Sequence, residues 1–498
     1  MKSLKCASID GIEAVSIDVE STFTKGLPSF SIVGMANTAI QESKDRIKSA
    51  LLTNGFKFPP KRITINLSPS EIAKKGSQID LAISLLIALQ ETKLDMDNFY
   101  VFGELGLDGS LKDTKSIFVL ILSLARSGDV KNILIPKESI PKVSTIPNIN
   151  IYAVDNLADA IKFFHTKDKS SYKIENKIFD YQHLNINNHK YYYTKKYDLD
   201  FEDIKGQTIA KKAALISAAG GHNIILEGSP GCGKSMIAKR LKYISAPMKL
   251  EEILDVAKIE SLQGKQPTFI PQRVFISPHH SSTKASIVGG TSIGEVALSN
   301  HGILFFDELP HYPKPVLEAM REPLEDNEIS ISRVNNKIKY PTKFLFICAM
   351  NPCPCGNALA KSKVCRCTEL EVQRYKNKIS DPFLDRIDIY VVMNEVTKDD
   401  KSDVTSKELH NKVVDVFKIQ KLRGQEELNG KLSDTDILKY CILTKDAQNI
   451  LDTSIERFAL SFRAINKVLK VGRTIADLDN SKDIETKHII EALSYRKR

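Results

Sequence analysis

The stretch Asn223–Arg240 reads NIILEGSPGCGKSMIAKR, and it decides the fold of the region around it. A short apolar run leads into a glycine-rich loop, and a helical pattern follows the loop directly. This is the G-x-x-x-x-G-K-[ST] phosphate loop in the strand–loop–helix context that separates it from a chance match. We therefore expect an α/β domain with a parallel sheet that binds ATP or GTP.

The residue types in this loop predict how the phosphates are held. Gly228, Gly231 and Gly233 let the backbone curl so that consecutive N–H groups face the phosphates. Lys234 is expected to reach the β- and γ-phosphate oxygens, and the Ser235 hydroxyl to ligate Mg²⁺. The predicted cofactors are therefore ATP and Mg²⁺.

A second apolar run, Ile303–Phe306, ends in the acidic pair Asp307 and Glu308. The carboxyl end of a parallel strand is where ligands bind, so the pair is expected beside the phosphate loop. Asp307 would hold Mg²⁺ through water, and Glu308 would polarise the attacking water. This pattern predicts a hydrolytic ATPase rather than a passive nucleotide binder.

The strand expected at Phe344–Ala349 delivers Asn351 to the same edge, where its amide can touch the γ-phosphate or orient the water. The alternative for Asn351 is a cap on the turn before a proline. Arg386, in ISDPFLDRID, and Arg463, in LSFRAINKVLKVGRTIADL, are candidate phosphate sensors because guanidinium is planar and always charged. The alternative for Arg386 is an ordinary salt bridge with a neighbouring aspartate, at position 385 or 388.

Four of the eight cysteines crowd into the stretch MNPCPCGNALAKSKVCRC, at Cys353, Cys355, Cys365 and Cys367. In a reducing compartment, four thiolates favour tetrahedral Zn²⁺ over disulfides. The zinc would be structural, because four protein ligands leave no open position for chemistry. Redox switching and plain buried thiols are the alternatives.

Length and composition bound the class of protein. With 498 residues, two to four domains are expected, and 42% hydrophobic with 27% charged residues is typical of a globular chain. The apolar runs are too short to cross a bilayer and no signal peptide opens the chain, so we expect a cytoplasmic protein without membrane contact. The net charge of +10 favours a polyanionic partner, although a lysine bias spread over the whole chain would give the same value.

Amino-acid composition and the predicted secondary-structure pattern divide the chain into four regions. Residues 1–165 alternate short apolar runs with helical patterns, and residues 166–200 are rich in Lys, Asn and Tyr and are expected to be a linker with a partly ordered surface segment. Strand and helix signals alternate again over 201–400. The pattern is mainly helical over 401–498.

Several motifs in this order resemble a known family. They are VGMANTAIQESKDRIKSAL, PPKRITINLSPSEIAKKGSQIDLAI, GELGLDGSL, the phosphate loop, PHHSSTKASIVGG, FFDELPHY, REPLEDNEISISR, MNPCPCG and RTIADL. Together they resemble the magnesium-chelatase-like branch of the AAA+ ATPases, and more narrowly its ComM/YifB family of competence-associated proteins. The resemblance covers nearly the whole chain apart from the linker.

The resemblance implies an AAA+ core with a helical C-terminal lid, assembled as a hexameric ring with active sites at the subunit boundaries. Arg386 would be the finger that a neighbouring subunit supplies, and Arg463 the arginine of the lid. The family is regarded as a motor that drives branch migration on single-stranded or branched DNA during recombination. The alternative function is that of a magnesium-chelatase-type ATPase that remodels a protein. The extra N-terminal region and the CPCG motif argue against this alternative, because such subunits resemble only the ATPase part.

The same resemblance implies a β-hairpin that points into the ring, which EISISRVNNKIKYP matches. Its candidates for contacts with the DNA backbone are Arg333, Lys337 and Lys339, and the alternative is a solvated basic hairpin. His279 and His280, in PHHSST, are weaker candidates for DNA contact.

The N-terminal region resembles a Lon-protease-like domain, which implies an α/β fold of the ribosomal-S5 type. Proteolysis would need a Ser–Lys dyad. The two dyad positions fall near Gln78 and Phe118, with Ser77 and Lys115 nearby. We therefore expect a DNA-binding or ring-stabilising platform rather than a protease.

Overall fold

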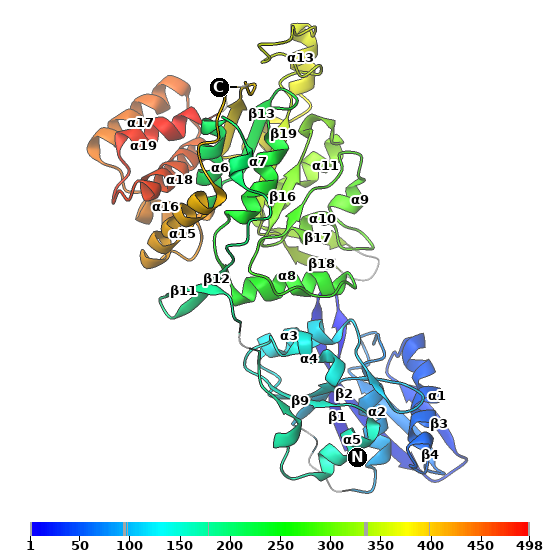
Figure 1. The fold of residues 1–498 in the computed structure, drawn as a ribbon. Helices are drawn as coiled ribbons and strands as arrows, with labels where there is room; N and C mark the ends of the chain where they lie inside the picture. The colour runs from blue at the N-terminus through cyan, green and yellow to red at the C-terminus, as the bar shows by residue number, and fades with distance from the viewer. Residues whose placement is uncertain are drawn as a thin grey trace. The chain divides into compact units, whose positions relative to one another are not determined.

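The computed structural model describes residues 2–92, 96, 98–177, 179–332, 337–397 and 399–496. The chain forms two compact units, which we treat separately (Figure 1). The first comprises the chain up to Asp180 together with Ala257–Thr268, and the second comprises Tyr181–Val256 and Phe269–Arg498.

The first unit is built on a mixed eight-stranded sheet in the order β10-β9-β8-β5-β1-β2-β4-β3. The strands β1, β2 and β4 are antiparallel, whereas β5, β8 and β9 run parallel to one another. The strand bounds are β1 Lys2–Asp10, β2 Glu13–Thr24, β3 Ser29–Val33, β4 Arg62–Ser68, β5 Phe99–Val101, β8 Asn132–Pro136, β9 Asn150–Val154 and β10 Lys173–Ile174. Two shorter strands, β6 Glu104–Leu105 and β7 Leu111–Lys112, form a ribbon of their own.

The helices of this unit bury apolar faces against the sheet. The central helix α2, Asp80–Ala88, is buried along nearly its whole length, which matches a sequence that is apolar all round. The other helices are α1 Thr38–Thr53, α3 Ile117–Ser127, α4 Ile140–Val143 and α5 Leu157–His165.

The two dyad positions hold no catalytic pair. Gln78 is buried, and its amide donates to the carbonyl oxygens of Ala7 at 3.1 Å and Lys75 at 2.9 Å. Phe118 is a fully buried side chain of α3. The nearby Ser77 hydroxyl donates to the carboxylate of Glu104 rather than to a lysine.

The stretch expected to be a linker, residues 166–200, carries regular structure. Strands β11, Gln182–Ile186, and β12, His189–Tyr193, form a hairpin, and β12 also pairs with β14, Met248–Lys249. Tyr191 and Tyr192 are buried there. Because tyrosine rings bury much area, they supply the apolar surface that the few aliphatic residues of this stretch do not.

The second unit contains a five-stranded, fully parallel sheet in the order β15-β16-β19-β13-β20. The strands are β13 Ile224–Gly228, β15 Phe275–Ile276, β16 Ile303–Phe306, β19 Leu345–Met350 and β20 Ile389–Met393. All residues of β13 and β16 are buried, as expected for strands covered on both faces. The carboxyl ends of β13, β16 and β19 therefore meet at one edge, where the phosphate loop begins.

Helices and one further hairpin surround these strands. They are α6 Thr208–Gly220, α7 Lys234–Arg240, α8 Leu250–Leu262, α9 Lys284–Ile287, α10 Glu295–Leu298, α11 Lys314–Ala319, α12 Arg321–Asp326, the hairpin strands β17 Glu328–Ser332 and β18 Lys337–Pro341, α13 Glu369–Lys376 and α14 Asp381–Leu384.

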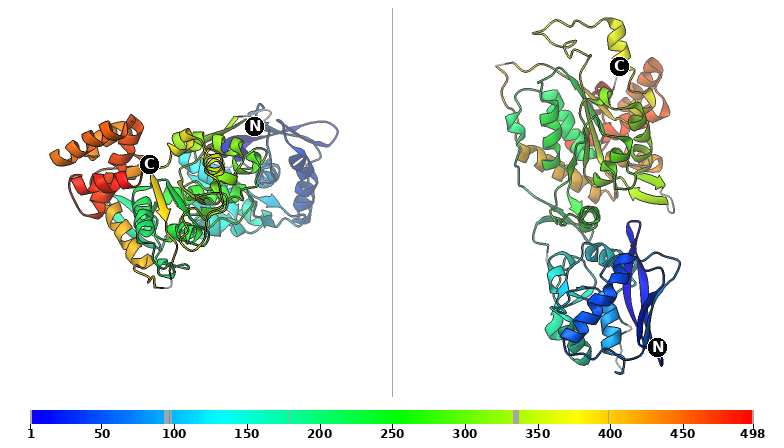
Figure 2. Two further views of the ribbon diagram at one scale, coloured as in Figure 1. Left: turned by 90° about the horizontal axis from the view of Figure 1, so that it is seen from above. Right: turned by 90° about the vertical axis from the view of Figure 1, so that its right-hand side faces the viewer.

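The C-terminal region is helical, as predicted. Its helices are α15 Ser406–Leu422, α16 Asp434–Tyr440, α17 Lys445–Phe458, α18 Phe462–Leu478 and α19 Thr486–Ser494. Side chains of Thr405, Ser433, Thr444 and Ser461 cap the first four of them. In the ribbon views the orange and red helices α16–α19 form a group of their own beside the green strands of the parallel sheet (Figure 2). None of the helices in the described residues has the length and apolarity needed to cross a bilayer.

Candidate active site

The phosphate loop connects β13 to α7 and has the conformation that its glycines permit. Gly231 and Gly233 have φ angles of +83° and +99°, a left-handed region that side chains rarely adopt. Gly228 is needed for space instead, because a Cβ atom there would lie 2.7 Å from the sulfur of Cys232. The loop is therefore closely packed against its own strand.

The ammonium group of Lys234 is the centre of the site. It donates to the carbonyl oxygens of Gly228 at 2.6 Å and Ser229 at 3.0 Å, and to Oδ1 of Asn351 at 3.1 Å. Burial lowers the pKa of Lys234, although the charges of the nearby acidic groups, Asp307 among them, oppose this effect. An anionic ligand at the loop would favour the charged ammonium in the same way.

Two oxygen ligands suited to Mg²⁺ lie next to Lys234. The Ser235 hydroxyl donates to Oδ2 of Asp307 at 2.8 Å, which brings the loop and the end of β16 together. Hydroxyl and carboxylate oxygens are hard donors of the type that Mg²⁺ prefers. The donor set therefore fits the predicted ion.

Glu308 follows Asp307 in a left-handed backbone conformation, with φ +53° and ψ +47°. Its side chain is half exposed, and one carboxylate oxygen lies 3.3 Å from Nδ1 of His280. The ring of His280 packs against that of His279, with the centroids 4.3 Å apart. The sequence pattern PHHSST pointed to these histidines, but not to their contact with Glu308.

Arg386 and Arg463 share one carboxylate. Both guanidinium groups donate to Glu325 of α12, and the bond from Arg463 measures 2.8 Å. Burial would raise the pKa of Glu325, but Arg386 and then Arg463 outweigh this effect and lower it. The ion-pair partner of Arg386 is thus a distant glutamate, not the aspartate at position 385 or 388 that the sequence suggested.

A second set of hydrogen bonds connects α18 to the turn that carries Arg386. Lys467 lies one helical turn after Arg463, and its ammonium donates to the carbonyl oxygens of Asp385 and, at 3.1 Å, Ile387. The two arginines are therefore held on the same part of the surface by two independent sets of contacts.

Arg386 lies at the wrong end of the sheet to act on its own phosphate loop. The Asn223 amide, directly before β13, donates to the Arg386 carbonyl oxygen at 3.0 Å. The phosphate loop begins at the other end of β13, and at about 3.3 Å per residue the strand separates the two ends by roughly 16 Å. This is longer than an arginine side chain reaches, so Arg386 does not contact the phosphate loop of its own chain.

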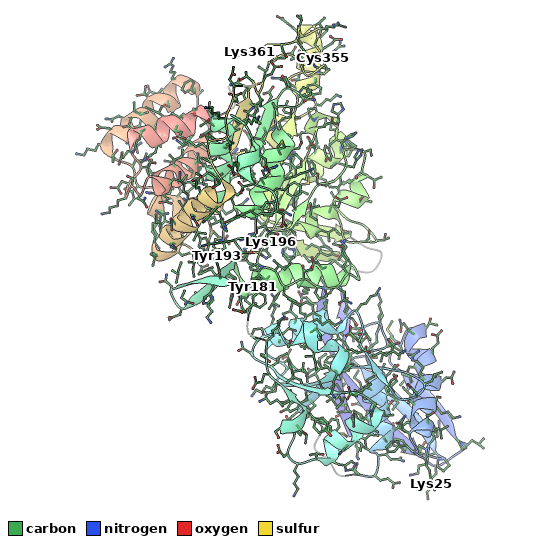
Figure 3. All side chains as sticks on the ribbon, viewed as in Figure 1. Lys25, Tyr181, Tyr193, Lys196, Cys355 and Lys361 are labelled. Carbon is green, nitrogen blue, oxygen red and sulfur yellow. The ribbon has the colours of Figure 1, made fainter. Side chains whose placement is uncertain are left out.

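The four cysteines Cys353, Cys355, Cys365 and Cys367 are brought together. Their sulfur atoms lie within 4.8 Å of one another, and three of the pairs measure 3.4, 3.7 and 3.6 Å. Tetrahedral zinc with bonds of about 2.3 Å places its sulfurs about 3.8 Å apart, whereas a disulfide needs about 2.05 Å. Backbone N–H groups of Asn357 and Arg366 lower the pKa of Cys355 to about 6, whereas burial and hydrogen bonds to the neighbouring thiols raise the pKa values of Cys365 and Cys367. The cluster fits Zn²⁺, and Figure 3 shows Cys355 on the yellow segment near α13.

The cysteine loop packs against the phosphate loop. Gly356 has φ +79°, and a Cβ atom there would lie 2.7 Å from Cδ of Pro230 in the phosphate loop. Further along, Lys376 at the end of α13 pairs with buried Glu227 of β13 at 2.9 Å. The cysteine loop therefore touches the phosphate loop itself, and the helix after it is paired with the strand that leads into that loop.

The β17–β18 hairpin carries the predicted DNA candidates. Lys337 is exposed, whereas the Lys339 ammonium pairs with Glu328 at 2.7 Å across the hairpin, which raises the pKa of Lys339. Arg333 lies outside the described residues. Of the described candidates, Lys337 is the one whose charge is not matched within the hairpin.

Three family models match the chain. The model described as magnesium chelatase, subunit ChlI, matches residues 200–401, and the ChlI C-terminal model matches residues 403–496. A third, described as subunit ChlI of Mg-chelatase, matches residues 19–139 of the first unit. The matches thus include the parallel sheet, the C-terminal helices and much of the first sheet.

Curated relatives match over almost the full length. The chain is 35% identical to "Competence protein ComM" of Haemophilus influenzae and 35% identical to "Uncharacterized protein YifB" of Salmonella typhimurium. Each alignment covers 98% of this chain and 95% of the relative. A magnesium-chelatase subunit ChlI homolog of Methanocaldococcus jannaschii is 22% identical over 58% of this chain and 83% of its own length.

Proposed function

Because the chain belongs to the ComM/YifB family of magnesium-chelatase-like proteins, we propose that it is an AAA+ ATPase that acts on DNA as a hexameric ring, driving branch migration of recombination intermediates during natural transformation. The observation that carries the ATPase is the contact of Lys234 with Asn351 and of Ser235 with Asp307 at the carboxyl edge of the sheet. The name of the Haemophilus relative supports a role in competence.

In this proposal each residue of the site has one task. The loop N–H groups and Lys234 bind and orient the phosphates, while Asn351 fixes Lys234 and the γ-phosphate relative to each other. Mg²⁺ held near Ser235 and Asp307 would neutralise developing charge on the phosphates. Glu308 accepts the proton of the attacking water, since it is half exposed and beside the loop.

The arginines are the basis for proposing a ring. Arg386 lies at the other end of β13 from the phosphate loop of its own subunit. Arg463 binds Glu325, the same carboxylate as Arg386, and so lies away from that loop as well. A neighbouring subunit would instead present its nucleotide to both arginines at once. Arginine is suited to this task because its planar charge matches the transition-state phosphate.

DNA is the partner that the charge favours. The net charge is +10, and Lys337 offers an unmatched ammonium on the hairpin proposed to face the DNA. Arg333, on the same connection, and Lys339 would add phosphate contacts, the latter after release from Glu328. The first unit is proposed as a Lon-protease-like platform that supports the ring, and the four cysteines as a structural Zn²⁺ site of a cytoplasmic, reduced protein.

The proposal is tested by ATP hydrolysis measured without DNA and with linear duplex, single strands or a four-way junction. Marked stimulation by single-stranded or junction DNA is expected, and Lys337→Gln should reduce it without changing the rate in the absence of DNA. Hydrolysis that is indifferent to all three DNAs would favour the second candidate, a protein-remodelling ATPase. The ChlI homolog among the relatives is the observation that keeps this candidate in view.

A further inference from the structure

The second unit contains a cavity of about 350 Å³ away from the nucleotide site. Its floor is formed by Gly302 and Ile303 at the start of β16 and by Phe344 and Leu345 at the start of β19. Those strands present their carboxyl ends to the phosphate loop, so the cavity lies at the opposite edge of the sheet. Its size is in the range of small-molecule sites.

The walls combine aromatic rings with long cationic side chains. Tyr191 of β12, Phe417 of α15 and Phe344 contribute rings to the lining. The ammonium group of Lys421, one turn after Phe417, lies 5.3 Å from the centre of that ring and 5.9 Å from the centre of the Tyr191 ring. Lys249 lies 5.9 Å from the Tyr191 ring as well. A ligand here would therefore meet apolar faces and positive charge together.

Cations outnumber carboxylates around the cavity. The cationic side chains are Lys249, Arg273, Lys343, Lys421 and Lys431, and the carboxylates are Glu252, Glu426 and Glu427.

Two of the carboxylates are already matched. Glu252 binds Arg273 at 3.0 Å and His301 at 3.2 Å, and Glu427 binds Lys343 at 3.0 Å. Their charges still reach the lysines, since Glu427 and Glu252 raise the pKa of Lys421 and Glu427 raises that of Lys431, but burial outweighs this effect in both.

Lys249, Lys421 and Lys431 have no carboxylate within ion-pair distance in the part of the chain that the structure describes. Lys421 is buried, and its ammonium donates to the backbone carbonyl oxygens of Gln425, at 3.2 Å, and of Glu426. Burial, followed by the charge of Lys249, lowers the pKa of Lys421 to about 8, and burial also lowers the pKa of Lys431. Unmatched ammonium groups around a cavity are unfavourable until an anion enters.

We propose that this cavity binds a small organic phosphate, a phosphate monoester of a molecule that carries an aromatic or heteroaromatic ring. The phosphate would lie among Lys249, Lys421 and Lys431, because lysines bind phosphate as point charges and a monoester carries up to two negative charges. The ring would pack against Tyr191 and Phe417. The site is separate from the ATP site and independent of any role on DNA.

The test is titration calorimetry on the full-length protein without added ADP or ATP, because these are themselves organic phosphates with a heteroaromatic ring and would compete for the cavity. The probes are phenyl phosphate, AMP and inorganic phosphate. Saturable binding of phenyl phosphate or AMP is expected, and inorganic phosphate should bind at least tenfold more weakly because it lacks a ring.

Matched variants locate the binding. Lys421→Met and Lys431→Met should each weaken it at least tenfold, while Lys418→Met, at a half-exposed lysine one turn earlier on α15, should leave it unchanged. If Lys421→Met fails to fold, Lys431→Met alone decides. The proposal is overturned if the unaltered protein binds none of the probes, or if Lys431→Met binds them as the unaltered protein does.

Discussion

Glu308 combines a left-handed backbone with a half-exposed carboxylate, and His280 lies beside it. Such a backbone costs free energy and persists where the surrounding structure holds it. The contact with His280 keeps the carboxylate at the mouth of the site. At the scale of single residues, this geometry is compatible with the proposed task of Glu308, the activation of water.

Glu308→Gln should leave ATP binding intact and lower turnover by about 10²- to 10⁴-fold, the usual contribution of a general base. The measurement is steady-state hydrolysis together with binding of a fluorescent ATP analogue. Glu456→Gln, an exposed carboxylate of α17, is the control. Hydrolysis that persists in Glu308→Gln would remove Glu308 from this task.

His301 makes stability depend on pH. Burial alone would lower the pKa of His301, but hydrogen bonds to Asp255 and Glu252 outweigh it and raise the pKa. A raised folded-state pKa stabilises the protein fully below the unfolded value of about 6.5, and the gain is lost as pH rises through the folded pKa.

The replacement His301→Asn tolerates the local φ of +56° and removes the charge. It should lower the free energy of unfolding by about 1 to 3 kcal/mol at pH 6 and by less at pH 9. Urea unfolding at the two pH values gives the comparison. An equal or larger loss at pH 9 would show that His301 is not charged in the folded protein.

At the scale of elements, the cysteine loop contacts the phosphate loop. We therefore expect ATP binding to depend on Gly356, which is far from the phosphate loop in sequence but next to it in the fold. Gly356→Ala combines an unfavourable φ with a close approach to Pro230, and should weaken ATP binding by roughly 5- to 100-fold, equivalent to about 1 to 3 kcal/mol. Gly424→Ala is the matched control, since its φ is +85° but no atom lies within 4 Å of the added Cβ. Equal effects on ATP affinity in both variants would contradict the contact.

The cysteine cluster predicts one zinc ion per chain. Cys365→Ser should lose the metal and expose the segment from residue 353 to α13 to hydrogen exchange, because four ligands close an otherwise polar loop. Elemental analysis and hydrogen exchange measure both effects. Cys6→Ser, at an isolated buried cysteine, should keep the metal. A full zinc content in Cys365→Ser would contradict the assignment.

Local sequence predicted the elements whose signal is contained in a short stretch. The phosphate loop, the strand before Asp307 and the helical character of residues 401–498 are such elements. The hairpin of residues 182–193 was not predicted, because its stability comes from pairing with β14 about fifty residues later. The same reason hid Glu325, which meets Arg386 and Arg463 only after the chain has folded.

At the scale of the whole molecule, the proposed ring predicts that the arginines of one subunit complete the site of another. Arg386→Ala and Lys234→Ala should each lack turnover, while a mixture should regain activity, because some boundaries then pair an intact phosphate loop with an intact arginine. The measurement is ATP hydrolysis over a range of mixing ratios. A mixture no more active than either variant alone would contradict action between subunits.

Glu325→Gln tests whether the arginines work as a pair. The carboxylate binds both guanidinium groups, so its loss should lower turnover more than ATP affinity and leave folding intact. Glu318→Gln, on the neighbouring helix α11 and paired with Arg321, is the control. A change in ATP affinity alone would place Glu325 outside the pair.

The most direct test of the central claim is movement of a four-way DNA junction by the purified protein. A labelled junction with mobile arms is incubated with ATP, and the separated duplex products are quantified over time. We predict ATP-dependent product formation by the unaltered protein and none by Glu308→Gln. An unaltered protein that hydrolyses ATP yet leaves the junction intact at every protein concentration would contradict a DNA branch-migration motor.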